Sequence, residues 1–139
     1  EDKKPDPQKI RQIVILASMI EKETAVHEEM RKIAGVFENR LEKGMYLQCD
    51  PTVIYGIGPD FDGNLQSKDL KNASNPYNTY RRSGLPPTPI CSPGIAALQA
   101  AQNPEDHSYL YFVSKGNGEH KFSRNLREHN KAVRKYLLN

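Results

Sequence analysis

The chain has 139 residues, 37% of them hydrophobic and 27% charged, and its formal net charge is +3 at pH 7. This length and apolar content suffice for one hydrophobic core, so we expect a single domain over residues 1–139. Acidic and basic residues are interspersed, and no basic run is longer than a pair such as Arg81-Arg82, which argues against a nucleic-acid-binding surface. The two cysteines are far apart and the histidines are scattered, so no metal site is predicted.

A short apolar segment at residues 13–20 is followed by two acidic residues, Glu21 and Glu23. Eight uncharged residues are too few to cross a lipid bilayer, which needs about 20. Asp6-Pro7, upstream, is typical of a helix N-cap followed by the first helical residue. We therefore predict a helix from there to about Thr24, buried on most of its circumference.

The two glutamates lie on different faces of this helix. At 100° per residue, Glu23 continues the apolar stripe formed by Ile13, Leu16 and Ile20, whereas Glu21 lies about 200° away. At the edge of an apolar core the charged form of a carboxyl is disfavoured, so its pKa rises toward the ~6–7 that suits a general acid. Periodicity alone leaves open the alternative that both glutamates are solvated residues of the last turn.

Two shorter patterns follow. Residues 27–43 carry apolar residues at helical spacing and end before Gly44, a typical helix stop. Residues 45–48 are short and extended. Asp50-Pro51 has the pattern of an N-cap and a first helical residue, so we assign Asp50 a capping role at the start of a short helix that ends near Gly56.

Residues 72–93 are rich in Asn, Pro, Ser and Tyr and cannot form a long helix or a central strand. An ordered loop of this length in a small domain is usually functional. Its prolines lower the entropy lost on ordering, and its tyrosines and amides suit the faces and hydroxyl groups of sugar rings. We expect this loop to pack against the end of the first helix and to form a cleft wall; a flexible linker is the alternative.

The last third of the chain predicts a helix, a hairpin and a second helix. An alanine-rich helix is expected to about residue 103, after the cap Ser92-Pro93-Gly94. Residues 109–113 and 119–123 predict an antiparallel hairpin, to which residues 45–48 could add a third strand. Residues 126–138 predict a final amphipathic helix. The expected fold class is therefore α+β, mainly helical with a small antiparallel hairpin or three-stranded sheet.

Four stretches of the sequence occur in an order and spacing that resembles one family. They are residues 16–24 (LASMIEKET), residues 47–56 (LQCDPTVIYG), Tyr77-Asn78-Thr79-Tyr80 with Gly84-Leu85-Pro86-Pro87, and Ser92-Pro93-Gly94. The chain resembles the catalytic domain of the YceG-like endolytic murein transglycosylases of bacteria over nearly its whole length. Residues 20–24 also resemble, more faintly, the end of the catalytic helix in soluble lytic transglycosylases and goose-type lysozymes, which implies a lysozyme-like helical domain.

The resemblance implies a lytic transglycosylase that cleaves the β-1,4 bond between N-acetylmuramic acid and N-acetylglucosamine in peptidoglycan and leaves 1,6-anhydromuramyl ends. It puts the catalytic acid on Glu23, in agreement with the helical-wheel argument. It implies no metal and no organic cofactor. The residues that it suggests for the glycan cleft are Gln48, Tyr77, Asn78, Tyr80, Leu85, Pro86 and Pro87.

The resemblance also implies a location and partners. It implies a bacterial inner-membrane protein whose catalytic domain faces the periplasm, after an N-terminal transmembrane helix and a LysM-like domain. The chain begins with Glu1 and contains no signal-peptide pattern and neither of those parts, so we expect a fragment that meets the membrane only through the missing anchor. Peptidoglycan strands are the implied substrate, and penicillin-binding peptidoglycan synthases are candidate partners.

Two other functions fit the same residues. A muramidase that adds water would need a second carboxylate, Asp50 or Glu21, and would leave no anhydro ends. A non-catalytic module would bind or scaffold peptidoglycan through the loop, and Glu23 would merely pack.

Cys49 and Cys91 each precede a predicted helix start. A disulfide between them would close a loop of about forty residues and stabilise the fold by ~3–4 kcal/mol, provided that their Cα atoms lie within ~7 Å. We expect two buried free thiols instead. We expect His27 and His120 at the surface and His129 in packing contacts.

Overall fold

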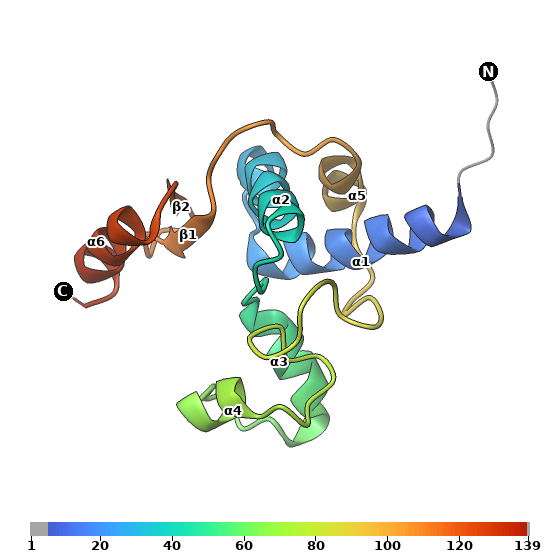
Figure 1. Cartoon of the computed structure of the whole chain (residues 1–139), viewed down its shortest axis with the longest axis horizontal. Helices are drawn as coiled ribbons and strands as arrows, with labels where there is room; N and C mark the ends of the chain where they lie inside the picture. The colour runs from blue at the N-terminus through green and yellow to red at the C-terminus, as the bar shows by residue number, and fades with distance from the viewer. Residues whose placement is uncertain (1–5, 139) are drawn as a thin grey trace.

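The computed structural model describes residues 6–138 (Figure 1). Its elements in chain order are α1 (Pro7–Glu23), α2 (His27–Glu42), α3 (Asp50–Ile57), the 3-10 turn η1 (Gly58–Asp60), α4 (Ser67–Lys71), α5 (Ile95–Gln102), β1 (Tyr111–Ser114), β2 (His120–Ser123) and α6 (Leu126–Tyr136). The predicted α+β class is confirmed. Within residues 6–138, none of the helices combines the length and apolar character needed to cross a membrane.

Helix α1 is the central element of the fold. Helices α2 and α5 pack against α1 and against each other, and α3 contacts α1 as well (Figure 1). Strands β1 and β2 and helix α6 pack together as a separate unit, which lies at the opposite end of the molecule from the start of α1. The segment that leads from α5 to β1 crosses α2 on the way.

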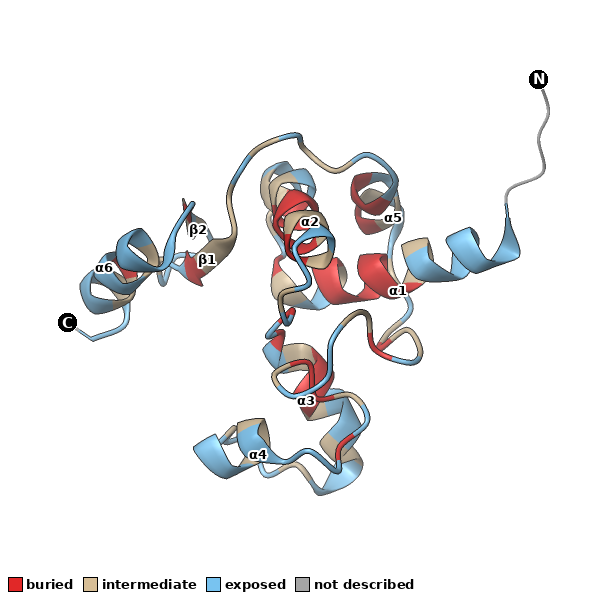
Figure 2. Ribbon diagram, viewed as in Figure 1, coloured by how far each residue is buried: buried red, intermediate tan, exposed pale blue. Residues whose placement is uncertain are grey.

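The predicted start and end of α1 are confirmed. The Asp6 carboxylate accepts a hydrogen bond from the Gln8 N–H at 3.0 Å, and Pro7 occupies the first turn. Residues 15–20 are all buried, so this part of the helix is covered on every side (Figure 2). The backbone becomes extended at Thr24, whose hydroxyl accepts from the Val26 N–H and turns the chain into α2.

The segment between α5 and β1 is fixed to α2. The Glu105 N–H donates to the Arg31 carbonyl at 2.9 Å, and the His107 imidazole bonds the Lys32 carbonyl at 2.8 Å. Gly35 permits this close crossing, because a Cβ at that position would lie 2.5 Å from the Glu105 carbonyl oxygen and from His107 Nε2. These contacts determine where the hairpin begins relative to the core.

Of the two predicted alternatives, a hairpin or a three-stranded sheet, the structure has the hairpin. Strands β1 and β2 form a two-stranded antiparallel sheet in which Tyr111 faces Ser123 and Ser114 faces His120. Residues 45–48 do not join it because Gln48 has φ +51°, a left-handed backbone conformation incompatible with a strand. The Gln48 N–H donates instead to the Thr79 carbonyl at 3.2 Å, which ties this segment to the loop of residues 72–93.

The predicted N-cap role of Asp50 is wrong. Helix α3 already includes Asp50, and its N-cap is Cys49, which makes no side-chain capping bond. The Asp50 carboxylate accepts a hydrogen bond from the Tyr80 hydroxyl instead. The Asp-Pro pattern therefore marked the helix start correctly to within one residue, but the Asp50 side chain is available for another role.

Candidate active site

A cleft of about 650 Å³ lies between the core helices and the unit formed by β1, β2 and α6. One side of the cleft carries the polar residues Glu23, Gln48, Asp50 and Tyr80. The other side is formed by β1, by His120 and by residues of α6. Glu23 is thus the last residue of the central helix and stands at the cleft that separates the two parts of the fold.

The Glu23 carboxyl lies in an environment that favours its protonated form. Burial, the largest effect, and the nearby negative charge of Asp50 raise the pKa of Glu23 from 4.5 to about 7, whereas the hydrogen bond from Cys49 acts in the lowering direction. The Cys49 Sγ lies 3.5 Å from Glu23 Oε1. A carboxyl with this pKa can donate a proton near neutral pH and take it back as a base.

Cys49 holds its place through the loop. Its N–H donates to the Thr79 hydroxyl at 2.8 Å, and burial, followed by the charge of Glu23, raises the pKa of its thiol well above the ordinary range. The thiol therefore stays neutral and can donate to the Glu23 carboxyl. Cys49 and Cys91 are both free, as expected, with Cys49 buried and Cys91 half-buried.

Asp50 and Tyr80 form a second polar pair in the cleft. The Tyr80 hydroxyl donates to Asp50 Oδ1 at 2.5 Å. Burial, and then the hydrogen bond to Asp50, raise the pKa of the Tyr80 phenol, so the hydroxyl remains a donor. This pair holds a carboxylate beside Glu23 in a defined orientation.

The structure separates the two glutamates of the first helix. Glu21 accepts a hydrogen bond from the Gly94 N–H at 2.8 Å, at the N-cap of α5, whereas Glu23 lines the cleft. The helical-wheel argument predicted this division correctly. Glu21 stabilises the start of a core helix, where a negative charge also interacts favourably with the helix dipole.

The structure brings together only part of the predicted glycan-binding set. Gln48 and Tyr80 line the cleft with Glu23, but Tyr77, Asn78, Leu85 and Pro86 do not. The Tyr77 hydroxyl bonds Thr88 at 2.9 Å, and its ring packs edge-on against Tyr55. Leu85 packs against the core.

Asn78 is fully buried and serves the loop itself. Its Nδ2 lies within hydrogen-bonding distance of the carbonyl oxygens of Asp69, Leu70 and Asn72, and its Oδ1 accepts from the Tyr80 N–H at 3.0 Å. Pro86 is buried as well. These residues fix the path of residues 72–93 and thereby the position of Tyr80.

Sequence reasoning missed three residues that line the cleft: Arg40 on the core side, and Tyr111 and His129 on the side of β1 and α6. The Arg40 guanidinium lies 4.8 Å from the Tyr111 ring centroid, and Tyr111 stacks on His129 with ring centroids 4.9 Å apart. No local motif reveals this group, because its members come from α2, β1 and α6. The amphipathic pattern of residues 126–138 predicts an apolar helix face but does not indicate what that face contacts.

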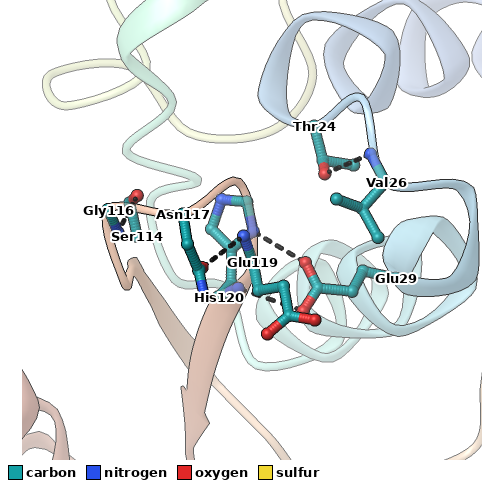
Figure 3. A network of polar contacts seen from close by, with 8 residues as sticks. All are labelled: Thr24, Val26, Glu29, Ser114, Gly116, Asn117, Glu119 and His120. Atoms are coloured by element: carbon teal, nitrogen blue, oxygen red, sulfur yellow. Dashed lines mark hydrogen bonds and ion pairs between the residues drawn. The ribbon is translucent and has the colours of Figure 1, made fainter.

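Glu29 anchors the hairpin beside the cleft (Figure 3). One oxygen of its carboxylate accepts from the His120 N–H at 3.0 Å, and the other pairs with His120 Nδ1 at 2.9 Å. His120 is therefore mostly buried, with 9% of its side chain exposed, and the expectation that it lies at the surface is wrong. The contact joins β2 to the first turn of α2, close to the turn that follows Glu23.

Comparison with known proteins identifies the family. The profile of the YceG-like family matches residues 1–135. The chain belongs to the YceG-like family. A crystal structure of a YceG-like protein from Listeria monocytogenes superposes with a TM-score of 0.82 at 43% identity, covering 90% of this chain and 41% of that one.

Two curated members of the family are described as endolytic murein transglycosylases. The one from Bacillus subtilis is 46% identical over 128 residues, and the one from Streptococcus pneumoniae D39 is 32% identical over 132 residues. Each match covers 92% of this chain, but only 35% and 24% of those proteins. The chain thus spans about a third or less of the length of these curated relatives. Across residues 6–138, no group of three or more His, Cys, Asp or Glu side chains is arranged to hold a metal ion.

Proposed function

We propose that this domain is an endolytic lytic transglycosylase that cleaves the bond between N-acetylmuramic acid and N-acetylglucosamine in peptidoglycan strands. The observation that carries the proposal is Glu23, a half-buried carboxyl with a pKa of about 7 at the wall of an open cleft. The names of the two curated relatives support the same reaction.

The proposed reaction needs one residue that first gives and then takes a proton. Glu23 protonates the bridging oxygen, and the bond from the muramyl C1 to that oxygen breaks, with its electron pair leaving on the oxygen. The resulting carboxylate then accepts the proton of the muramyl C6 hydroxyl while O6 bonds to C1. The products are a 1,6-anhydromuramyl end and a new N-acetylglucosamine end, and Glu23 is again protonated.

The neighbours of Glu23 suit the charges of this reaction. Positive charge develops on the muramyl ring as the bond breaks, and the Asp50 carboxylate, fixed by Tyr80, can stabilise it from the same cleft. Gln48 has an exposed side chain and a left-handed backbone conformation, with φ +51°. Residues other than glycine keep this conformation only where the surrounding structure holds them in it, often at functional sites. We assign its amide to hydrogen bonds with the substrate.

The proposal extends to the setting in which the domain works. Uncleaved peptidoglycan strands lie outside the cytoplasmic membrane, so we place the catalytic domain on the periplasmic face of the bacterial inner membrane. We further propose that it acts on nascent strands and sets their length, next to penicillin-binding synthases.

Product analysis tests the proposed reaction. Purified sacculi are digested with the wild-type domain, Glu23→Gln and Glu21→Gln, and the released muropeptides are identified by mass spectrometry. We expect anhydromuramyl ends with the wild type and Glu21→Gln, and a loss of at least about 100-fold with Glu23→Gln. Anhydro ends that persist in Glu23→Gln would remove that residue from the mechanism.

A hydrolytic muramidase is the second candidate, because the structure places another carboxylate, Asp50, in the same cleft as Glu23. The same experiment in water enriched with ¹⁸O separates the two reactions. Hydrolysis yields reducing muramic acid ends that carry the label, whereas transglycosylation consumes no water and yields unlabelled anhydro ends.

A further inference from the structure

Helix α6 presents an apolar stripe to the open cleft. Leu126, Val133 and the C-cap residue Leu137 recur at spacings of seven and four residues, which places them on one face, and they line the cleft together with His129. Leu126 and Leu137 are 55% and 56% exposed, whereas Ala132 is the one buried residue of the helix. Single exposed leucines are ordinary, but aligned leucines in a cleft indicate a binding surface.

The stripe lies beside polar groups that are held rigidly. Tyr111 stacks on His129, and Arg40 fixes Tyr111 from the core side while its Nε donates to the Leu110 carbonyl at 2.6 Å. Burial and the charge of Arg40 lower the pKa of His129, so its imidazole is neutral near pH 7. The Nδ1 atom of His129 is buried, and His129 as a whole is half-buried, so the ring can contact a sugar only through its exposed edge or face.

From this arrangement we infer that the α6 stripe and His129 form a second glycan subsite, which binds N-acetylated sugar rings of the strand away from the bond that Glu23 cleaves. The inference rests on the proposed function, because it takes the occupant of the cleft to be a glycan. A sugar ring offers apolar C–H faces and a rim of hydroxyl and amide groups, and this wall offers an apolar stripe with a neutral imidazole.

Two observations favour a glycan over another occupant. The stripe belongs to the same continuous cleft as Glu23, so a strand bound for cleavage passes along it. The cleft side of α6 carries no charged residue, and its charged residues, such as Lys131 and Arg134, are outside the lining, which suits an uncharged sugar ring. A strand that fills both sides of the cleft would be bound more tightly than a short fragment.

Binding measurements in the inactive Glu23→Gln background test the subsite. Peptide-free glycans of one disaccharide and of several disaccharides are titrated against Glu23→Gln and against the same protein with Leu126→Ser and Leu137→Ser. Burial of two exposed leucines predicts that the double change raises the Kd of the long glycan about tenfold or more. The preference for long over short glycans should shrink by the same factor. Lys131→Ser, on another face of α6, is the matched control and should bind like its parent.

The outcomes separate this inference from the proposed reaction. Anhydromuramyl products from the wild type, together with an unchanged length preference in the double variant, would overturn the subsite and leave the reaction in place. Length-dependent binding that needs the two leucines, without anhydro products, would retain the subsite and reject the reaction. The wild-type protein could also dimerise as its concentration rises, while the variant with Leu126→Ser and Leu137→Ser stays monomeric. That result would show that a second copy covers the stripe and would overturn the inference.

A second measurement needs no change in α6. The leucine and valine methyl resonances of Glu23→Gln are recorded by NMR during titration with the long glycan. We expect the Leu126, Val133 and Leu137 methyl groups to shift at the same glycan concentration as groups near Gln48. Methyl resonances of α6 that stay unmoved at saturation would overturn the subsite.

Discussion

Three effects of opposing sign, burial and two neighbouring side chains, determine the pKa of Glu23. Burial, the largest effect, and the charge of Asp50 favour the protonated carboxyl, whereas the hydrogen bond from the Cys49 thiol favours the carboxylate. The active form of a general acid is the protonated one. Activity on the alkaline side should therefore fall as the pH rises through about 7, where Glu23 loses its proton.

Asp50→Asn should move this alkaline limb to lower pH. The amide keeps an acceptor for the Tyr80 hydroxyl but removes a negative charge that raises the pKa of Glu23. We expect the ratio of kcat/KM at pH 8 to kcat/KM at pH 5 to be several-fold lower in Asp50→Asn than in wild type. Release of soluble muropeptides across the pH range measures both values. Asp60→Asn, an exposed change outside the cleft, is the control. An alkaline limb that stays in place would show that Asp50 does not act on Glu23 through its charge.

Glu23→Gln should stabilise the folded domain at alkaline pH. Because the pKa of Glu23 is raised from 4.5 to about 7 on folding, the native state binds more protons than the unfolded state between these values, and wild-type stability falls as pH rises through this window. Glutamine carries no such cost. We expect the variant to gain at most about 3 kcal/mol relative to wild type between pH 4 and pH 8, measured by urea unfolding.

Glu42→Gln, an exposed glutamate at the end of α2, is the matched control for that experiment. Its stability should follow the wild-type curve through the whole range. Parallel curves for wild type and Glu23→Gln would mean that the native carboxyl is solvated, as the alternative interpretation of the sequence holds.

For single residues, the sequence predicted the site residue whose position depends on one helix face. It missed the site residues whose positions depend on contacts between distant parts of the chain. Glu23 was found because its position follows from periodicity within one helix. The role of Asp50 was missed because an Asp-Pro pair at a helix start equally fits an N-cap. Arg40, Tyr111 and His129 come together only after α2 has packed against β1 and β1 against α6, and a single sequence does not reveal that packing.

Among the elements, the loop of residues 72–93 shows most clearly how a composition can mislead about individual side chains. Its Asn and Tyr residues were assigned to sugar binding, but Asn78 and Tyr77 bond within the protein and only Tyr80 faces the cleft. A side-chain amide can bind a sugar hydroxyl, but it can equally bond the backbone carbonyl groups of its own loop, which have no partners in a helix or a sheet. The helix bounds were predicted well, since caps and apolar periodicity are local signals.

Asn78→Ala should therefore destabilise the fold. The change opens a cavity at a fully buried side chain and leaves the carbonyl groups of Asp69, Leu70 and Asn72 and the Tyr80 N–H without their partner, which should cost about 2–4 kcal/mol of unfolding free energy. Thermal and urea unfolding measure the loss, and Asn64→Ala, an exposed change in another loop, should cost less than about 0.5 kcal/mol. A variant of normal stability with weakened glycan binding would instead restore Asn78 to the substrate-binding set.

Over the whole molecule, the cleft depends on how the unit of β1, β2 and α6 is held against the core. Asn39 donates to the carbonyl groups of His107 and Tyr109, and Glu29 fixes His120 from the first turn of α2. Arg40 completes the attachment. Arg40 is only 6% exposed, and its guanidinium bonds both the segment before α3 and the segment before β1.

Arg40→Lys should weaken the attachment between the two sides of the cleft while keeping the positive charge. The guanidinium donates from Nε to the Leu110 carbonyl and from Nη1 to the Tyr46 carbonyl, both at 2.6 Å, and lies 4.8 Å from the Tyr111 ring centroid, a geometry that one ammonium group cannot reproduce. We expect a loss of about 2 kcal/mol in stability, faster amide exchange in β1 and at least tenfold lower kcat/KM per folded molecule. Arg31→Lys replaces an exposed arginine with one bond to the Asn103 carbonyl and should leave all three unchanged. If Arg40→Lys lowers stability but cleaves peptidoglycan at the wild-type rate per folded molecule, the hairpin and α6 do not have to be held in place for the reaction at Glu23.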